Sequence, residues 1–139
     1  MAAFTCELPI RFSDIDHAGI VYYPRFFHFF HVAFEELWRA KMGGRAYAEL
    51  IDRDRVGFPC VHAECDFHAP LRFGDTAAIE VTISRFRTKS ITIRYRVYRA
   101  EPRTLSAEGQ VVCAVVDLAR FVAIPAPERV TAMLADLVE

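Results

Sequence analysis

Several signals that mark common protein classes are missing from this chain of 139 residues. The N-terminus has no basic segment followed by an apolar stretch and a cleavage site, so we expect a cytoplasmic protein. Basic and acidic side chains number 17 and 18, so no overall field draws the chain to nucleic acid or an anionic membrane. The G-x-S-x-G, P-loop and dinucleotide-binding motifs are also absent, which disfavours the corresponding enzyme classes.

Cysteine is sparse, and its four copies form no C-x-x-C pair. Cys6, Cys60, Cys65 and Cys113 stand mostly in apolar segments. In a reducing compartment, we expect them to be small buried hydrophobic residues without disulfides.

Aromatic residues, in contrast, make up 13% of the chain, and many of them fall in one segment. From Tyr22 to about Met42 the pattern predicts a helix, with Pro24 in its first turn and Gly43-Gly44 at its end. Charged residues interrupt this segment, so we do not expect a membrane span. Apolar side chains cover most of its circumference, which predicts a central helix wrapped by other structure.

The remaining segments read mainly as strands, and no internal repeat divides the chain, so we expect one domain over residues 1–139. A strand is predicted over Ala3–Phe12, a short irregular or helical piece over Ala46–Ile51, and a final helix with Val130, Met133, Leu134 and Leu137 on one stripe. Alternating residues predict further strands up to about Val122, with turns at 73–75 and 101–103 and a central strand over 111–116. This order favours the α+β class, with an antiparallel sheet curling around one buried helix.

The loop before the long helix, Phe12–Pro24, is the best candidate for a reactive site. It places Asp14 and Asp16 next to the first N–H groups of a helix, which can polarise a carbonyl as negative charge develops on its oxygen. Pro24 has no N–H group, so the Tyr23 and Val21 amides are the candidate donors. A carboxylate here can attack the carbonyl or activate water, and capping of the helix is the structural alternative.

The segment FSDIDHAGIVYYPRFF resembles the signature of the 4-hydroxybenzoyl-CoA thioesterase branch of the hotdog-fold superfamily. The resemblance implies a hotdog fold, hydrolysis of an acyl-CoA and no cofactor, because coenzyme A is part of the substrate. It also implies that Asp16 is the catalytic carboxylate and that the Tyr23 amide polarises the thioester carbonyl. Members of the family pair with further copies, so we expect a homodimer or homotetramer.

Two positions depart from the hydroxybenzoyl enzymes. His17 stands where those enzymes tend to have Pro, and His31 stands where their pocket offers an Asp to the substrate phenol. Both departures resemble benzoyl-CoA thioesterases, so we expect a benzoyl-like acyl group, of the kind met in aromatic degradation, in contact with Ile20, Phe27 and His31. His17 either orients substrate or water or makes only local hydrogen bonds.

A basic segment, FRTKS at Phe86–Ser90, looks like the family's segment near the CoA nucleotide. Arg85, Arg87 and Lys89 share one face if the strand runs straight, and such a cluster suits phosphates. We therefore assign Arg87, Lys89 and Ser90 to substrate binding. The alternative is a solvated edge that discourages aggregation.

Other functions remain open at the level of sequence. The same chain suits a thioesterase for short or branched aliphatic acyl groups, a hotdog hydratase or dehydratase, or an acyl-CoA binding protein without catalysis. A metal site is disfavoured: His28, His31 and Glu35 come from a single helix, and Cys65 points away from His62 and His68 on a strand.

Overall fold

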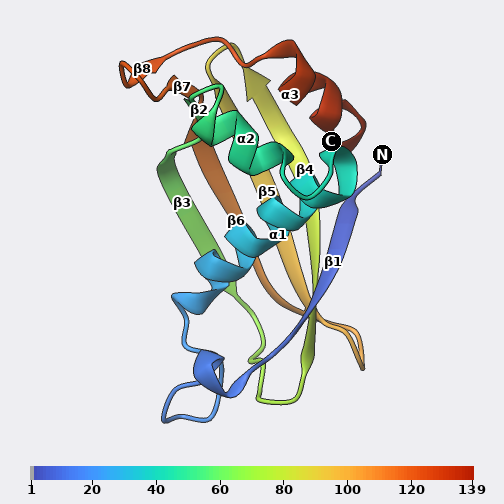
Figure 1. The fold of residues 1–139 in the computed structure, drawn as a ribbon. Helices are drawn as coiled ribbons and strands as arrows, with labels where there is room; N and C mark the ends of the chain where they lie inside the picture. The colour runs from blue at the N-terminus through green and yellow to red at the C-terminus, as the bar shows by residue number, and fades with distance from the viewer. Residues whose placement is uncertain (1) are drawn as a thin grey trace.

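The computed structural model describes residues 2–139, and its main element is an antiparallel sheet of five strands in the order β1-β4-β5-β6-β3 (Figure 1). The predicted α+β class is confirmed by this sheet and the long helix on its face. The strands are β1 (Phe4–Pro9), β3 (Cys60–Phe67), β4 (Thr76–Arg87), β5 (Ser90–Arg99) and β6 (Thr104–Ala114).

Helix α1 (Arg25–Met42) crosses one face of the sheet (Figure 1). It ends before Gly43, whose φ of 97° suits a residue without a side chain. The predicted helix is confirmed, but it begins at Arg25 rather than Tyr22. Tyr22 belongs to the turn that leads into the helix, and its carbonyl accepts the Arg25 N–H at 2.8 Å.

One stripe of α1 is buried in the described chain, and this stripe packs on the sheet, as expected for a central helix. His28 and Glu35 lie on the opposite, exposed face, and His31 is exposed at the border of the buried stripe. The buried side chains recur at the spacing of three and four residues that places them on one side of a helix. They are Phe26, Phe29, Phe30, Ala33, Phe34, Leu37 and Trp38.

The centre of the core is a contact between α1 and the middle of the sheet. The Phe30 ring stacks on Tyr95 of β5, with 4.6 Å between centroids and 6° between planes. Gly109 of β6 makes room for this ring, because a Cβ atom there would lie 2.7 Å from Phe30 and 2.6 Å from the Glu64 carbonyl. A missing side chain thus allows the helix and the sheet to approach each other closely.

The short elements gather at one end of the molecule, with α2, α3 and a small sheet near the top of Figure 1. The loop between β1 and α1 lies at the other end. The predicted C-terminal stripe of Val130, Met133, Leu134 and Leu137 is confirmed, because all four side chains are buried. The elements at the first end are α2 (Ala46–Asp52), β2 (Val56–Gly57), β7 (Val116–Asp117), β8 (Val122–Ala123), α3 (Glu128–Leu134) and η2 (Ala135–Leu137). The short helix η1 (Phe12–Asp14) lies in the loop between β1 and α1.

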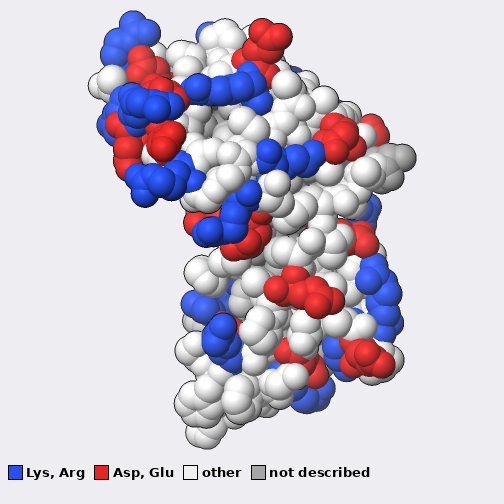
Figure 2. All heavy atoms as spheres, turned by 45° about the vertical axis from the view of Figure 1, so that its right-hand side comes forward, with Lys and Arg blue, Asp and Glu red and all other residues white. Residues whose placement is uncertain are grey.

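Strand β3 is an edge strand and pairs only with β6 in the described chain. Most of its side chains are exposed, including Val61 at 64% and Phe67 at 47%. Such an edge offers unpaired backbone groups beside apolar side chains. Positive and negative side chains are interspersed on the face shown in Figure 2, and the lower end of that face carries little charge.

The four cysteines are free, but they do not share one environment. Cys113 is buried, Cys6 and Cys65 are half-buried, and Cys60 is exposed. The prediction of buried hydrophobic residues therefore holds for Cys113 and is wrong for Cys60, which begins the edge strand. Within residues 2–139, no helix is long and apolar enough to cross a membrane.

Candidate functional site

Asp14 anchors the loop between β1 and α1. Its carboxylate is 3% exposed and accepts hydrogen bonds from the Arg11 N–H at 2.8 Å and from the Arg25 side chain at 2.7 and 3.1 Å. Its carbonyl accepts the Tyr22 N–H at 2.9 Å. The protein's own donors therefore use the hydrogen-bonding capacity of this buried carboxylate. Asp14 therefore has the structural role that the sequence left as an alternative, and it fixes the loop to the first residue of α1.

Asp16 closes the next turn and keeps part of its side chain accessible. Its Oδ1 accepts the Ala18 N–H at 2.8 Å, its carbonyl accepts the Gly19 N–H at 3.0 Å, and its own N–H donates to the Ile20 carbonyl at 2.9 Å. Gly19 has a φ of 83°, a conformation that strains other residues. Oδ2 has no hydrogen-bond partner within residues 2–139, so one carboxylate oxygen is held and the other is open.

The two candidate amide donors differ in the structure. The Val21 N–H donates to the Leu71 carbonyl at 2.8 Å, so the prediction that it is an open donor is wrong. The Tyr22 N–H is bound to Asp14, and Pro24 has none. Among the described residues, nothing accepts the Tyr23 N–H, which lies two residues before the first residue of α1. Tyr23 is therefore the amide at the helix start that is left for a ligand.

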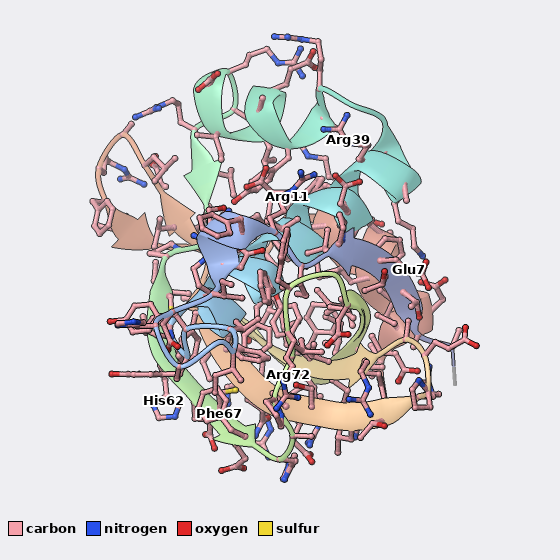
Figure 3. All side chains as sticks on the ribbon, turned by 90° about the horizontal axis from the view of Figure 1, so that it is seen from below. Glu7, Arg11, Arg39, His62, Phe67 and Arg72 are labelled. Carbon is pink, nitrogen blue, oxygen red and sulfur yellow. The ribbon has the colours of Figure 1, made fainter. Side chains whose placement is uncertain are left out.

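A cavity of about 510 Å³, here called the loop cavity, opens beside these groups. Ile20 and Tyr23 line one side, and the chain that follows β3 lines the other. Figure 3 shows Phe67 and Arg72 from below at this end of the molecule. The Phe67 ring meets Tyr23 and Phe26 edge-on, with centroids 6.3 and 5.3 Å away. Tyr23, which carries the open amide, thus lines a space with mostly apolar walls.

A second cavity of about 340 Å³, here called the aromatic cavity, lies between α1, α2 and the sheet. The predicted acyl contacts are divided, because Phe27 and His31 line this cavity while Ile20 lines the loop cavity. Tyr47 and Phe58 were missed, since neither stands in a motif or a clear period. Burial, with a smaller effect of Glu35, raises the pKa of Tyr47 to about 12, so its hydroxyl stays protonated. The lining is Phe27, Phe30, His31, Phe34, Tyr47, Phe58, Cys60, Ala63, Ile93, Tyr95, Val111 and Cys113.

The histidines are not arranged as a metal site. His31 Nε2 contacts the Glu35 carboxylate at 2.8 Å on the exposed face of α1. The side chain of His17 is exposed and has no hydrogen-bond partner in the described part of the chain. No group of three or more His, Cys, Asp or Glu residues within residues 2–139 is placed to hold a metal ion.

The predicted nucleotide-binding residues lie far from Asp16 in one chain. Strand β4 starts beside the Asp16 loop, where the Ile10 N–H donates to the Asp75 carbonyl, and it ends at Arg87. At about 3.3 Å per residue, these ends are roughly 36 Å apart. One protomer therefore does not bring the basic segment and Asp16 to one site.

The shared face of Arg85, Arg87 and Lys89 required a straight strand, and the structure does not have one there. The pairing shifts register between Ile83 and Arg85, and the strand stops at Arg87. Lys89 lies in the turn between β4 and β5, so it does not continue the face of Arg85 and Arg87. Ser90 is the half-buried first residue of β5 and pairs with Arg87.

Comparison with known proteins places this geometry in a family. The model of the thioesterase-like superfamily matches residues 10–134. A 1,4-dihydroxy-2-naphthoyl-CoA hydrolase of Synechocystis sp. is 28% identical over 137 residues, which are 99% of this chain and 98% of the relative.

Solved structures of thioesterases are also similar to this chain. A 1,4-dihydroxy-2-naphthoyl-CoA thioesterase from Synechocystis superposes with a TM-score of 0.89 at 27% identity, over 98% of each chain. A gentisyl-coenzyme A thioesterase superposes with a TM-score of 0.80 at 28% identity, over 95% of this chain and 99% of the other. This chain belongs to the thioesterase-like superfamily. The predicted hotdog fold and the predicted enzyme class, a thioester hydrolase, are confirmed.

Proposed function

We propose that this protein hydrolyses an aromatic acyl-CoA to the free acid and CoA, with Asp16 as the reacting carboxylate and the Tyr23 N–H as the donor to the thioester carbonyl. The observation that carries the proposal is the pairing of an open carboxylate oxygen with an unbound helix-start amide in one short loop. Tyr23 lines the loop cavity, and the N–H of Asp16 donates to the carbonyl of Ile20, which also lines it. Family membership supports hydrolysis, and the names of the similar enzymes support an aromatic acyl group.

The chemistry needs only groups of this chain. A thioester carbonyl that accepts the Tyr23 N–H gains positive character at carbon, and the nearby helix dipole stabilises the oxyanion. Asp16 Oδ2 then attacks the carbon, expels the CoA thiolate and leaves an anhydride for water to open, or it takes a proton from an attacking water. Both routes remain part of the proposal. No cofactor enters either route, and His17 is assigned to orienting the substrate or the water.

The acyl ring is assigned to the aromatic cavity, where Phe27 lies one helical turn after Tyr23. A benzoyl group suits the apolar part of the wall. The polar groups of His31 and Tyr47 favour rings that also bear hydroxyls, as in 1,4-dihydroxy-2-naphthoyl-CoA, the substrate in the names of two similar proteins. A site with polar partners for a hydroxyl discriminates against analogues that lack it.

Asp16→Asn tests the function directly, because it keeps the shape and one acceptor oxygen while removing the charge. We expect kcat for benzoyl-CoA or 1,4-dihydroxy-2-naphthoyl-CoA to fall by about 10³-fold or more, while the dissociation constant measured by calorimetry changes little. Asp52→Asn on the exposed end of α2 is the matched control. Wild-type turnover in the Asp16 variant would show that this carboxylate is not the reacting group.

A panel of substrates then resolves the acyl group. The kcat/KM values for benzoyl-, 4-hydroxybenzoyl-, 1,4-dihydroxy-2-naphthoyl- and butyryl-CoA are compared under one condition. We expect the aromatic esters to exceed butyryl-CoA by at least about 10-fold, from the burial of several additional ring carbons. A preference for butyryl-CoA would support the aliphatic alternative, and tight binding of every ester without hydrolysis would support the non-catalytic one.

The proposed enzyme works as a homo-oligomer, a homodimer or homotetramer, in which one copy completes the nucleotide site of another. Two observations support this assembly: the roughly 36 Å between the two ends of β4, of which one adjoins the Asp16 loop and the other is Arg87, and the exposed apolar residues Val61 and Phe67 on the edge strand. A second β3 would pair with this edge and cover both side chains.

Mixing of inactive variants tests the shared site. We expect Asp16→Asn and a double variant, Arg87→Glu with Lys89→Glu, each to be poorly active alone and to regain activity when mixed and reassembled. Hybrid oligomers then contain sites with Asp16 from one copy and the basic residues from another. Light scattering checks that both variants assemble. A monomer at assay concentration, or hybrids without regained activity, would contradict a shared site.

A further inference from the structure

Two of the four cysteines face each other across neighbouring strands. Cys60, the first residue of β3, pairs in register with Cys113 of β6, and both line the aromatic cavity. The other two have no such partner, because Cys6 pairs with Ile79 and Cys65 pairs with Gly109. The chain therefore holds one cross-strand cysteine pair and two isolated cysteines that serve as internal controls.

The hydrogen bonds around this pair define its geometry. The Ala114 N–H donates to the Pro59 carbonyl at 3.0 Å, so the pair immediately before Cys60–Cys113 is hydrogen-bonded. Since the two kinds of site alternate in an antiparallel ladder, Cys60 and Cys113 occupy a non-hydrogen-bonded site, where Cα atoms are about 4.5 Å apart. Disulfides occur at Cα separations of about 4.4–6.8 Å. The two backbones therefore stand at bonding distance for their sulfur atoms.

The ladder is also interrupted beside the pair. The register shifts between Cys60 and His62, which leaves Val61 as an extra residue in the edge strand. The shift turns both Cys60 and Ala63 toward the cavity, although they are three residues apart. Such a bulge, at the start of an edge strand, can accommodate the small backbone movement that a new bond requires.

The two thiols differ in accessibility. Cys60 is exposed, and its Sγ lies 3.4 Å from the His62 carbonyl, so a rotation of this side chain brings the sulfur toward its partner. Cys113 is 7% exposed, and burial, with a smaller effect of Cys60, raises the pKa of its thiol to about 12. An oxidant therefore reaches the Cys60 thiol first. The buried Cys113 thiol does not react with the oxidant, and it reacts only after Cys60 has been oxidised.

We propose that Cys60 and Cys113 are a redox modification site, which hydrogen peroxide converts to a reversible disulfide in the wall of the aromatic cavity. The Cys60 thiolate attacks one peroxide oxygen, the O–O bond breaks, and Cys60 becomes a sulfenic acid as hydroxide leaves and takes up the proton that the Cys60 thiol lost, which gives water. The Cys113 sulfur then attacks the sulfenic sulfur, and the hydroxyl leaves as a second water with the Cys113 proton. Two thiols lose two electrons in total, and one peroxide gains them.

The bond changes the cavity that the proposed function assigns to the acyl ring, and this part rests on that function. It ties the first residue of β3 to β6 and removes the freedom of the bulge beside it. The Cys60 side chain lies on the cavity wall rather than on the free backbone edge, so pairing of β3 with a second copy leaves it in place. Oxidation is expected to raise KM for an aromatic acyl-CoA, while Asp16 and Tyr23 at the other end of α1 are unchanged.

The test uses the full chain treated with hydrogen peroxide in slight excess, then blocked with N-ethylmaleimide. Mass spectrometry of the intact protein is expected to show two blocked thiols instead of four, and peptide mapping is expected to find Cys60 joined to Cys113. Dithiothreitol restores four thiols. Cys60→Ser and Cys113→Ser each abolish the linked peptide, whereas the matched variant Cys6→Ser with Cys65→Ser retains it.

Three results would overturn the proposal. Peptides with Cys60 oxidised to sulfinic acid and Cys113 still reduced would show that the pair does not close. A disulfide between two copies on a non-reducing gel would show that Cys60 reacts with a second copy of the chain and not with Cys113. A linked protein with unchanged KM for benzoyl-CoA would overturn the effect on the cavity. The mapping involves no acyl-CoA, so it remains decisive even if the proposed hydrolysis fails.

Discussion

The Asp16 loop and the aromatic cavity are built in opposite ways. The loop is held by hydrogen bonds among residues that are close in sequence, with Asp14 joining Arg11, Tyr22 and Arg25. The cavity is held by ring contacts among segments far apart in sequence, such as Phe34 with Tyr47 and Phe58. Hydrogen bonds fix the orientation of the groups that they join, and the packing of rings fixes the volume of the space between them. The loop is therefore suited to position reacting groups, and the cavity is suited to select an acyl group.

Truncating the central ring should have the largest effect on stability. Phe30→Ala removes a side chain that is 1% exposed and stacks on Tyr95, and we expect a loss of about 3–5 kcal/mol in the free energy of unfolding. Urea denaturation measures this loss. Phe12→Ala, at a residue that is 76% exposed, is the control and should change stability little. Equal losses in the two variants would contradict the location of the core.

Asp14→Asn tests whether the Asp14 carboxylate positions the loop, and its expected effect on stability is smaller than that of Phe30→Ala. The amide keeps the shape but weakens the bonds to Arg25 and Arg11, so we expect a loss of about 1–3 kcal/mol. The misplaced loop should lower kcat more than it raises KM. Thermal unfolding and steady-state kinetics measure the two effects. A variant with unchanged stability and kcat would show that Asp14 does not position the loop.

Gly19→Ala probes the turn around Asp16 alone. A Cβ atom here meets nothing within 4 Å, so the cost is backbone strain at a φ of 83°, about 1 kcal/mol. We expect a modest fall in kcat at unchanged fold. Gly44→Ala is the matched control, because Gly44 does not have a positive φ. If both variants behave alike in urea denaturation and turnover, the left-handed turn has no part in placing Asp16.

The contrast between the two regions also explains what the sequence could reveal. Helix α1 was predictable because Pro24, Gly43 and the aromatic period all lie within one segment. The Asp16 loop was predictable for the same reason, and its open Tyr23 amide follows from neighbours in the chain. The walls of the aromatic cavity were predictable only in part. Phe27 and His31 lie on the predicted helix, whereas Tyr47 and Phe58 reach the cavity only through the packing of α1, α2 and β3.

The position of the basic segment was the other unpredictable feature. Its distance from Asp16 depends on the direction of β4 and on where that strand ends. The register shift after Ile83 and the turn at Lys89 are set by pairing with β5, which no local pattern reports.

Replacing the Tyr23 amide by an ester is the most direct test of the central claim, that an unbound N–H at the start of α1 polarises the thioester. Incorporation of the α-hydroxy analogue of tyrosine at position 23 removes this N–H and keeps the side chain. We expect kcat for an aromatic acyl-CoA to fall by about 10²–10³-fold with unchanged stability, because no residue among 2–139 accepts this N–H. The same ester at Tyr22 should lower stability, because it removes the bond to Asp14. Wild-type kcat in the Tyr23 ester would contradict the account.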